Sequence, residues 1–282
     1  MKVVTTTVEL ESQIAAARAA GKKVAFVPTM GALHEGHLSL VRLALQKCDF
    51  VVVSVFVNPL QFGANEDFDK YPRTLGIDAN LLAEHDVDVL FAPSPSEVYP
   101  SSNPVTQLTA GSLGAKFEGE IRPGHFDGML TVVNRLFDIV QPDYVFFGQK
   151  DAQQVALVKQ MLREQISSGS RSPIEFVVGP TIRSEAGLAL SSRNKFLKPE
   201  DMPAALSLSK ALFAGAAGKN REEVLALARA EISPQAKLEY LELVDADSFE
   251  PCEPGLSLAV LIVAARVGEV RLIDNVYIDR KS

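Results

Sequence analysis

Strand-like and helix-like segments alternate along residues 1–180, and this alternation constrains the fold more than any other feature of the chain. Short apolar runs are separated by amphipathic stretches. Because strands that alternate with helices usually pair in parallel, we expect an α/β fold with a doubly wound parallel sheet. The sequence predicts helices at residues 8–20, 35–47, 78–84, 129–140 and 152–164, and strands at residues 23–28, 50–57, 87–91, 144–147 and 174–178.

The pattern changes after about residue 183, which indicates a second domain. Two long helices come first, and a group of strands follows them. The last two strands are separated by Gly268, as in an antiparallel hairpin. The predicted helices are residues 201–216 and 221–232, and the predicted strands are residues 238–244, 256–265 and 270–278. We therefore expect a larger domain of residues 1–182 and a smaller α+β domain of residues 183–282, with a hinge within 183–194.

Two histidines follow the first strong strand, in the stretch His34-Glu35-Gly36-His37. A strand, a tight turn and a helix in this order direct the positive end of the helix at one point, which favours phosphate binding. Residues three apart lie on one helical face, so both imidazoles could donate to a triphosphate. Gly36 would let a ligand approach the backbone. The alternative is two surface histidines at a helix start.

Other polar side chains also follow the ends of predicted strands. Asn58 and Gln61 come after the second of the buried strands, and Lys150 comes after a later one. In a doubly wound sheet, ligands bind beyond the carboxyl ends of the strands. A basic turn with Arg122 and His125 could instead be a simple packing turn, a substrate-facing loop or an interface loop.

Composition narrows the function classes. The net charge is −7, so the chain lacks the overall excess of basic residues that favours binding to nucleic acid, and we expect no nucleic-acid partner. The longest apolar runs are too short to span a bilayer, and residues 1–13 lack the apolar core of a signal peptide. Cys48 and Cys252 are isolated and read as two buried thiols. These features predict a cytoplasmic protein without a membrane partner.

Taken together and in order, these stretches resemble the pantothenate synthetase (pantoate–β-alanine ligase) family, over nearly the whole chain. The resemblance implies a Rossmann-like nucleotide-binding domain and a smaller domain that closes over it. It also implies the ATP-dependent condensation of (R)-pantoate with β-alanine through a pantoyl adenylate, with AMP and pyrophosphate released. Mg²⁺ and a homodimer are implied as well. The matching segments are residues 27–37, 56–63, 71–74, 122–126, 147–151, 190–194 and, more loosely, 271–275.

The same resemblance suggests roles for single residues. His37 matches the residue usually named as proton donor, and Gln61 and Gln154 match glutamines that bind pantoate. The implied catalytic group is His34, His37, Lys150, Ser191, Ser192 and Arg193. The implied ATP-binding residues are Met30, Gly31, Ala32, Leu33, His34, Glu35, Gly36, His37, Gly148, Gln149, Lys150, Asp151, Ile182, Leu190, Ser191, Ser192 and Arg193.

Two positions depart from the pattern of the family. Gln149 stands where the family usually has glutamate, which removes a charge and leaves its role open. Asp78 could support Mg²⁺, but Ile77 stands where a second acidic residue is common. A solvated helix charge is the alternative for Asp78, and the metal ligands are therefore not assigned.

The chemistry of adenylation agrees with these residue types. The attack of a carboxylate on the α-phosphorus spreads negative charge over phosphoryl oxygens, which fixed donors stabilise. Side-chain amides can read the hydroxyls and carboxylate of pantoate without burying a charge. One rival function is a nucleotidylyltransferase that keeps the adenylate as its product, and another is a nucleotide-binding protein without catalysis. The first would not need the two glutamines, and the second would not need an intact set of cations.

Overall fold

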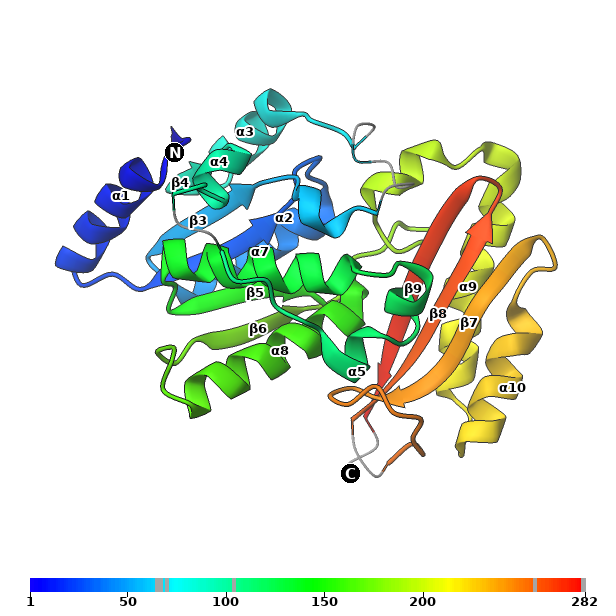
Figure 1. The fold of residues 1–282 in the computed structure, drawn as a ribbon. Helices are drawn as coiled ribbons and strands as arrows, with labels where there is room; N and C mark the ends of the chain where they lie inside the picture. Colours follow the sequence, from blue (N-terminus) through cyan, green and yellow to red (C-terminus); the bar gives the residue numbers. More distant parts are fainter. Residues whose placement is uncertain (64–67, 69–70, 103–104, 256–257, 280–282) are drawn as a thin grey trace. The chain divides into compact units, whose positions relative to one another are not determined.

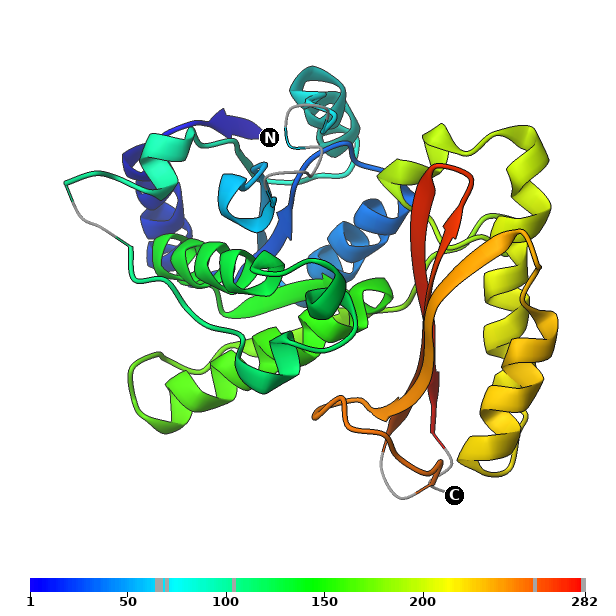
Figure 2. The ribbon, with the colours of Figure 1, turned by 45° about the vertical axis from the view of Figure 1, so that its right-hand side comes forward.

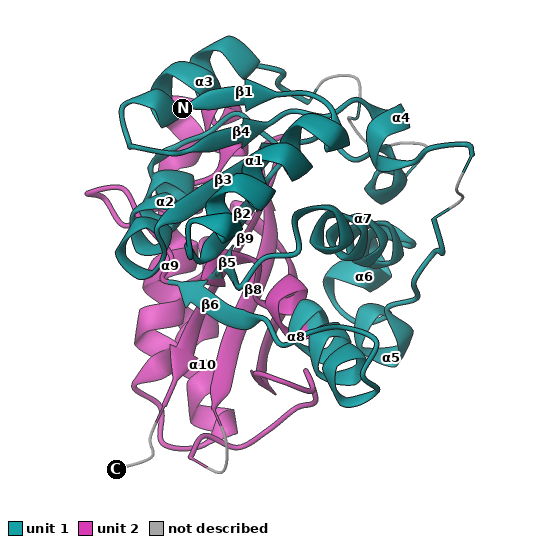
Figure 3. Ribbon diagram, turned by 90° about the vertical axis from the view of Figure 1, so that its left-hand side faces the viewer, with its two compact units in different colours: residues 1–148, 157–179 teal, residues 149–156, 180–282 magenta. Residues whose placement is uncertain are grey.

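The computed structural model describes the chain except for residues 64–67, 69–70, 103–104, 256–257 and 280–282 (Figure 1). The chain forms two compact units (Figure 3). Unit 1 consists of Met1–Gly148 and Leu157–Gly179, and unit 2 of Gln149–Ala156 and Pro180–Ser282. The short segment Gln149–Ala156 thus belongs to unit 2 although unit 1 surrounds it in sequence. The predicted division into domains at residues 182 and 183 stays a prediction.

Unit 1 is built on a six-stranded parallel sheet with the order β1-β4-β3-β2-β5-β6 (Figure 1). The strands are β1 (Lys2–Val4), β2 (Val24–Thr29), β3 (Phe50–Val55), β4 (Val89–Phe91), β5 (Tyr144–Gly148) and β6 (Glu175–Gly179). The helices longer than one turn are α1 (Thr7–Ala19), α2 (Glu35–Lys47), α3 (Leu75–Ala83), α7 (His125–Val140) and α8 (Ala152–Ser167), of which residues 152–156 belong to unit 2. The predicted α/β class is confirmed.

Helices cover both faces of this sheet. Ala25 and Val27 of β2 pack in one apolar cluster with Val41 of α2. Phe26, the residue between them, points to the opposite face and meets Phe137 of α7 at 6.4 Å between ring centroids. Because successive side chains of a strand alternate between faces, burial on both sides requires apolar residues at every position. This explains the continuous apolar runs in β2 and β3.

The direction of strand addition reverses between β2 and β5. The chain passes outward through β2, β3 and β4, and then returns to place β5 beside β2. Such a reversal leaves a crevice at the carboxyl ends of the two strands, where ligands bind in doubly wound sheets. The turn that leads to His34 follows β2, and the segment that begins at Gln149 follows β5. Both predicted phosphate-binding stretches therefore follow the strands of this reversal point.

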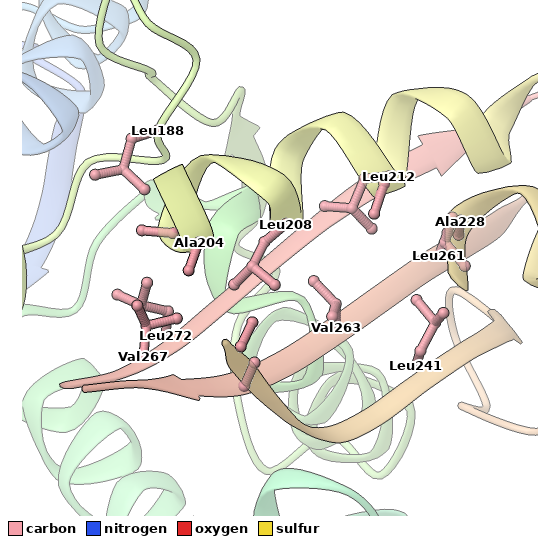
Figure 4. Packing of buried hydrophobic residues seen from close by; sticks show 14 of the residues in the cluster. Leu188, Ala204, Leu208, Leu212, Ala228, Leu241, Leu261, Val263, Val267 and Leu272 are labelled. Carbon is pink, nitrogen blue, oxygen red and sulfur yellow. The ribbon is translucent and has the colours of Figure 1, made fainter. Parts of the chain in front are cut away.

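Unit 2 is a three-stranded antiparallel sheet with two helices packed on it (Figures 2 and 4). Gly268 has a φ of 56° and joins the last two strands, so the predicted hairpin is confirmed. Leu208 and Leu212 of the first helix pack toward Leu261 and Val263 of the middle strand (Figure 4). The elements are α9 (Met202–Ala216), α10 (Arg221–Glu231), β7 (Ala236–Asp245), β8 (Ala259–Val267) and β9 (Val270–Ile278).

Several short elements were absent from the prediction. They are β1, the one-turn helices α4 (Pro95–Val98), α5 (Gly111–Gly114) and α6 (Glu118–Ile121), and the 3-10 turns η1 (Pro59–Gln61), η2 (Gln149–Asp151), η3 (Ser192–Phe196) and η4 (Pro199–Asp201). Elements of three to five residues carry too little periodicity to be recognised from sequence. The first two residues of the predicted strand 256–265 lie outside the described residues.

Two further expectations concern the whole chain. Cys48 and Cys252 are free thiols, the first buried and the second half-buried. Among the described helices, none combines the length and the hydropathy needed to cross a membrane.

Candidate active site

The turn after β2 is held by a buried carboxylate. Asp78, in the first turn of α3, is 1% exposed. Its two oxygens accept hydrogen bonds from the N–H of Ala32 at 3.1 Å and from the N–H of Leu33 at 2.8 Å. The hydroxyl of Thr74 donates to the same carboxylate at 3.2 Å. The alternative that Asp78 is a solvated helix charge is therefore wrong, because its carboxylate is buried and accepts hydrogen bonds from the backbone of this turn.

Gly31 begins the turn and tolerates no larger residue. Its φ is 81°, a left-handed conformation that favours glycine. A Cβ atom there would lie 2.9 Å from Val55 and 3.1 Å from the Asp78 carboxylate. The N–H of Gly31 donates to the hydroxyl of Thr29 at 3.1 Å. The amides of residues 31–33 thus stabilise the turn itself, and the phosphate donors that we expected here must come from side chains.

The two histidines cap the start of α2 reciprocally. The N–H of Gly36 donates to Nδ1 of His34 at 3.1 Å, and the N–H of His34 donates to Nδ1 of His37 at 3.3 Å. A ring nitrogen that accepts a hydrogen bond carries no proton, so each neutral imidazole carries its proton on Nε2. The rings lie 4.2 Å apart between centroids. The fold therefore presents two Nε2–H donors side by side at the positive end of a helix.

A buried amide pair follows β3. Gln61 is 7% exposed and Asn58 is 1% exposed. Nδ2 of Asn58 donates to Oε1 of Gln61 at 3.2 Å, and Nε2 of Gln61 lies 2.9 Å from Sδ of Met30. The predicted pantoate glutamine and the first residue of the predicted ATP-binding stretch are thus in direct contact within unit 1.

The sequence places Asn58 just past a buried strand and predicts no specific role for it. Its Nδ2 also donates to the carbonyl of Gly128 at 3.0 Å, and its Oδ1 accepts from the hydroxyl of Tyr99 at 2.8 Å. Burial raises the pKa of Tyr99, so this hydroxyl remains a donor. Asn58 is therefore the residue that fixes the Gln61 side chain. The spacing of two amides just past a buried strand was the signal that could have revealed it.

The basic turn with Arg122 and His125 forms a hydrogen bond to the backbone of Gln61. The guanidinium of Arg122 lies 3.0 Å from Nε2 of His125, and Nδ1 of His125 lies 2.9 Å from the backbone carbonyl of Gln61. Because a guanidinium only donates, Nε2 of His125 accepts from Arg122, and Nδ1–H of His125 donates to the backbone carbonyl of Gln61. Arg122 also pairs with Glu118 at 3.5 Å. Of the alternatives for this turn, these contacts favour the packing function.

In unit 2, the turn Gln149–Asp151 is anchored to the antiparallel sheet. Nδ2 of Asn275, on β9, donates to the carbonyl of Gln149 at 2.9 Å and to that of Lys150 at 2.8 Å. Nζ of Lys150 lies 3.3 Å from the carboxylate of Asp151. Gln154 is half-buried on α8 in the same unit.

The cationic loop of unit 2 is ordered by its own backbone. The N–H of Leu190 donates to the carbonyl of Ile182 at 2.9 Å. The hydroxyl of Ser191 accepts from the N–H of Arg193 at 3.2 Å and caps the 3-10 turn η3. Ser192 is half-exposed and Arg193 is exposed. The predicted site residues therefore fall into two groups, one organised within each unit.

The described part of the chain contains no cluster of protein ligands for a magnesium ion. Within it, no three His, Cys, Asp or Glu side chains come together as metal ligands. The oxygens of Asp78 are engaged by backbone amides. A metal ion would thus have to rely on nucleotide phosphates and water for most of its ligands, which is common for Mg²⁺.

A family model described as pantoate-beta-alanine ligase matches residues 2–277. The chain belongs to this family. Membership confirms the predicted class of enzyme, because the family consists of ligases of pantothenate biosynthesis.

Curated members of the family align along nearly the full chain. The pantothenate synthetase of Nocardioides sp. is 50% identical and covers 96% of this chain and 83% of its own length. That of Pseudomonas putida strain KT2440 is 46% identical and covers 99% of this chain and 98% of its own length.

Solved structures of the family share the fold. The pantothenate synthetase of Thermus thermophilus matches with a TM-score of 0.88 and 44% identity, covering 99% of this chain and 100% of that one. The Francisella tularensis pantoate-beta-alanine ligase, solved with β-γ ATP and β-alanine, matches with a TM-score of 0.79 and 36% identity, covering 98% and 97%. The predicted Rossmann-like architecture is therefore confirmed.

Proposed function

We propose that this chain condenses (R)-pantoate with β-alanine through a pantoyl adenylate, with ATP as the second substrate and AMP and pyrophosphate as products. The observation that carries the proposal is the pair of Nε2–H donors of His34 and His37, which follow β2 at the reversal point of the sheet. Two preorganised donors at a helix start suit the oxygens of a triphosphate.

The first step needs stabilisation of negative charge. The pantoate carboxylate attacks the α-phosphorus, the bond to the bridging oxygen breaks, and pyrophosphate leaves with the electron pair. His34 and His37 donate hydrogen bonds from Nε2–H to the phosphoryl oxygens, and His37 stabilises the departing pyrophosphate as a hydrogen-bond donor that keeps its proton. We assign Lys150, Arg193 and the hydroxyls of Ser191 and Ser192 to the same step as further donors. Little covalent chemistry falls to the protein, so positioning and electrostatics dominate.

The nucleotide is held by the remaining residues of the predicted set. The turn of residues 30–33 gives the triphosphate a rigid edge, because Asp78 fixes its backbone. Glu35 and Gly36 begin α2, and the side-chain space that Gly36 leaves open is filled by the ring of His34, which would lie 2.8 Å from a Cβ atom there. Gly148, Gln149 and Asp151 serve the ribose and phosphates, and Ile182 and Leu190 serve the adenine.

Gln61 and Gln154 bind pantoate. A side-chain amide both donates and accepts, so it suits a substrate with a carboxylate and two hydroxyls. Asn58 supports this assignment for Gln61. Its Nδ2 donates a hydrogen bond to Oε1 of Gln61 and thereby fixes the orientation of the Gln61 amide.

In the second step, the amine of β-alanine attacks the acyl carbon, the bond to the AMP oxygen breaks, and the amine loses a proton. Because an acyl adenylate is hydrolysable, exclusion of water is chemically useful. We assign nucleotide and pantoate binding to residues 1–182 and the role of a lid to residues 183–282.

Three further assignments belong to the proposal. Mg²⁺ accompanies the triphosphate and neutralises part of its charge, with no step of the protein's own chemistry assigned to it. The chain acts as a homodimer, as the resemblance implied. Its location is cytoplasmic, which the free thiols of Cys48 and Cys252 support, because disulfides are rare in reducing compartments.

The experiment is a partial reaction. With ATP and pantoate alone, we expect one equivalent of pyrophosphate per enzyme and no sustained release of AMP. Addition of β-alanine should start the turnover of AMP. Sustained AMP release without an amine would mean hydrolysis. A stable, free adenylylated product would favour the nucleotidylyltransferase.

A further inference from the structure

In unit 2, the buried side-chain amide of Asn275 donates hydrogen bonds to the backbone of the turn that contains Lys150. Asn275 is 2% exposed. Its Nδ2 donates to the carbonyls of Gln149 and Lys150 at 2.9 and 2.8 Å. Its Oδ1 accepts from Nε2 of Gln149 at 3.3 Å. All three hydrogen bonds of this side chain thus join β9 to a single turn.

The orientation of Asn275 is itself fixed. The backbone N–H of Asn275 donates to Oδ1 of Asp274 at 2.8 Å. Arg183 binds the Asp274 carboxylate with both terminal nitrogens, at 2.6 and 2.9 Å. A bidentate pair of this kind holds a planar geometry. Asp274 is only 5% exposed, so the pair is largely shielded from solvent.

The same arginine extends the network to the cationic loop. Nη1 of Arg183 donates to the carbonyl of Gly187 at 3.2 Å, and its guanidinium lies 5.1 Å from the centroid of Phe213. Arg183 also forms an isolated bridge with Ala189, directly before the stretch of residues 190–193. The Arg183–Asp274 ion pair is therefore connected both to the Gln149–Asp151 turn, through Asn275, and to the segment that precedes residues 190–193.

We propose that Asn275 is a positioning residue for adenylation, held by the Arg183–Asp274 pair, and that its task is to fix the Gln149–Lys150 turn so that the Lys150 ammonium is aimed at the transferring phosphoryl group. The inference rests on the proposed function of Lys150. The observation that carries it is that the side-chain hydrogen bonds of Asn275 go to the backbone and side chain of this turn.

The pairing also explains the amide at position 149. Asn275 cannot reverse its amide without giving up both carbonyl acceptors, so Oδ1 must face the side chain of residue 149. A donor is required there, and glutamine supplies one. A carboxylate at the same place would set two acceptors against each other.

The test is a double-mutant cycle on the single-turnover rate of pyrophosphate formation, measured per folded enzyme. Asn275→Ala should slow this step by about 10–100-fold, since a displacement of about 1 Å has an effect of that size. In a Lys150→Ala background, Asn275→Ala should add less than about threefold, because the group that it positions is gone. The affinity for pantoate should stay within about twofold.

A control variant separates positioning from loss of stability. Leu272→Ala opens a cavity in the core of the same unit, on the same strand, without a hydrogen bond to the turn. We expect it to lower the melting temperature and to leave the rate per folded enzyme within about twofold. An equal loss of rate in Leu272→Ala and Asn275→Ala would overturn the inference.

The remaining outcomes are distinct. A slow Lys150→Ala enzyme together with a normal Asn275→Ala enzyme would refute the positioning role alone. A normal Lys150→Ala enzyme would refute the proposed role of Lys150 and, with it, this inference. If Asn275→Ala does not fold, Gln149 provides the second test, because its side chain is only half-buried. Gln149→Glu should then be slower than Gln149→Ala by at least about threefold, and the reverse order would contradict the pairing.

Discussion

The carboxylate of Asp78 accepts a 2.8 Å hydrogen bond from the N–H of Leu33, which ties the turn after β2 to helix α3. A second bond to Ala32 makes the contact bidentate. The residues that precede His34 are therefore held by a side chain that is distant in sequence.

Asp78→Asn should weaken both the fold and the nucleotide step. An asparagine keeps the shape but turns one acceptor into a donor, so one buried N–H is left without its partner, at a loss of about 1–3 kcal/mol in the free energy of unfolding. Asp143→Asn is a matched control, because Asp143 accepts from the N–H of Val24 at the amino end of β2, at 2.8 Å. Denaturant titration should show a loss for both variants, and only Asp78→Asn should raise the Kd for ATP. A raised Kd in both would mean that the effect is one of global stability.

His37 offers a test of which ring nitrogen matters. Glutamine places an amide nitrogen near the position of Nε2, whereas asparagine places an amide oxygen near the position of Nδ1. Because the structure assigns the donor to Nε2, His37→Gln should retain about 10-fold more adenylation rate than His37→Asn or His37→Ala. A nitrogen NMR spectrum of the free enzyme should show Nδ1 of His34 and His37 unprotonated. Greater activity in His37→Asn would reverse the assignment.

The cations of unit 2 should matter for the same step. Lys150→Ala and Arg193→Ala should each slow pyrophosphate formation by about 10²–10³-fold, as expected for the loss of one preorganised donor. The melting temperature should hardly change, because Arg193 is exposed and Lys150 pairs with Asp151 outside the apolar clusters of α2 and α9. Rates within threefold of wild type for both variants would remove these residues from the site.

Gln154→Leu should weaken pantoate binding by about 5–150-fold, which corresponds to lost hydrogen bonds worth about 1–3 kcal/mol. The affinity for ATP should change by less than about threefold. Calorimetric titration with each ligand measures both. Unchanged pantoate binding would place the pocket elsewhere.

Gln61→Leu should show the same selective loss of pantoate binding together with a lower melting temperature, because it also breaks the contact with Asn58. Tyr99→Phe removes the hydroxyl that holds Asn58 and should give a smaller effect in the same direction. Equal losses for ATP and pantoate would mean that Gln61 shapes the fold alone.

The thiol of Cys48 should lose its proton at a higher pH than an ordinary cysteine. Burial, aided by the charges of Asp143 and Asp49, raises the pKa of its thiol from the ordinary 9.0 to about 11. In a Cys252→Ser background, the ultraviolet absorbance of the thiolate should therefore appear near pH 11. The unfolded chain releases this proton first, so the contribution of Cys48 to stability is complete below pH 9 and is lost as the pH rises toward 11. A thiolate signal centred near pH 9 would contradict the burial.

The sequence predicted the fold well where periodicity was long. Burial on both sheet faces produced the apolar runs of β2 and β3, and the spacing of apolar residues in α2 identified its helix. The start of α7 was missed by four residues, because residues 122–126 were interpreted as a basic turn although Phe126 already has the apolar spacing of the helix. The three-residue strand β1 offered no pattern at all.

The site was predictable in its residue types but not in its connections. Nothing near Asp78 in the sequence links it to Ala32, and nothing near Asn275 links it to Gln149. Contacts across such separations depend on how strands are ordered in a sheet, which local propensity does not encode. The tautomers of His34 and His37 likewise follow from backbone geometry at the helix start.

The pairing of β2 with β5 has a consequence for biosynthesis. Ala25 pairs with Tyr144, so the strand junction beside which ATP is expected to bind is absent until most of unit 1 has left the ribosome. The four strands made earlier, β1 to β4, leave the Tyr144 side of β2 without a neighbour until then. An open strand edge of this kind invites pairing with other chains. The nascent enzyme is thus at its most vulnerable to aggregation just before its catalytic crevice closes.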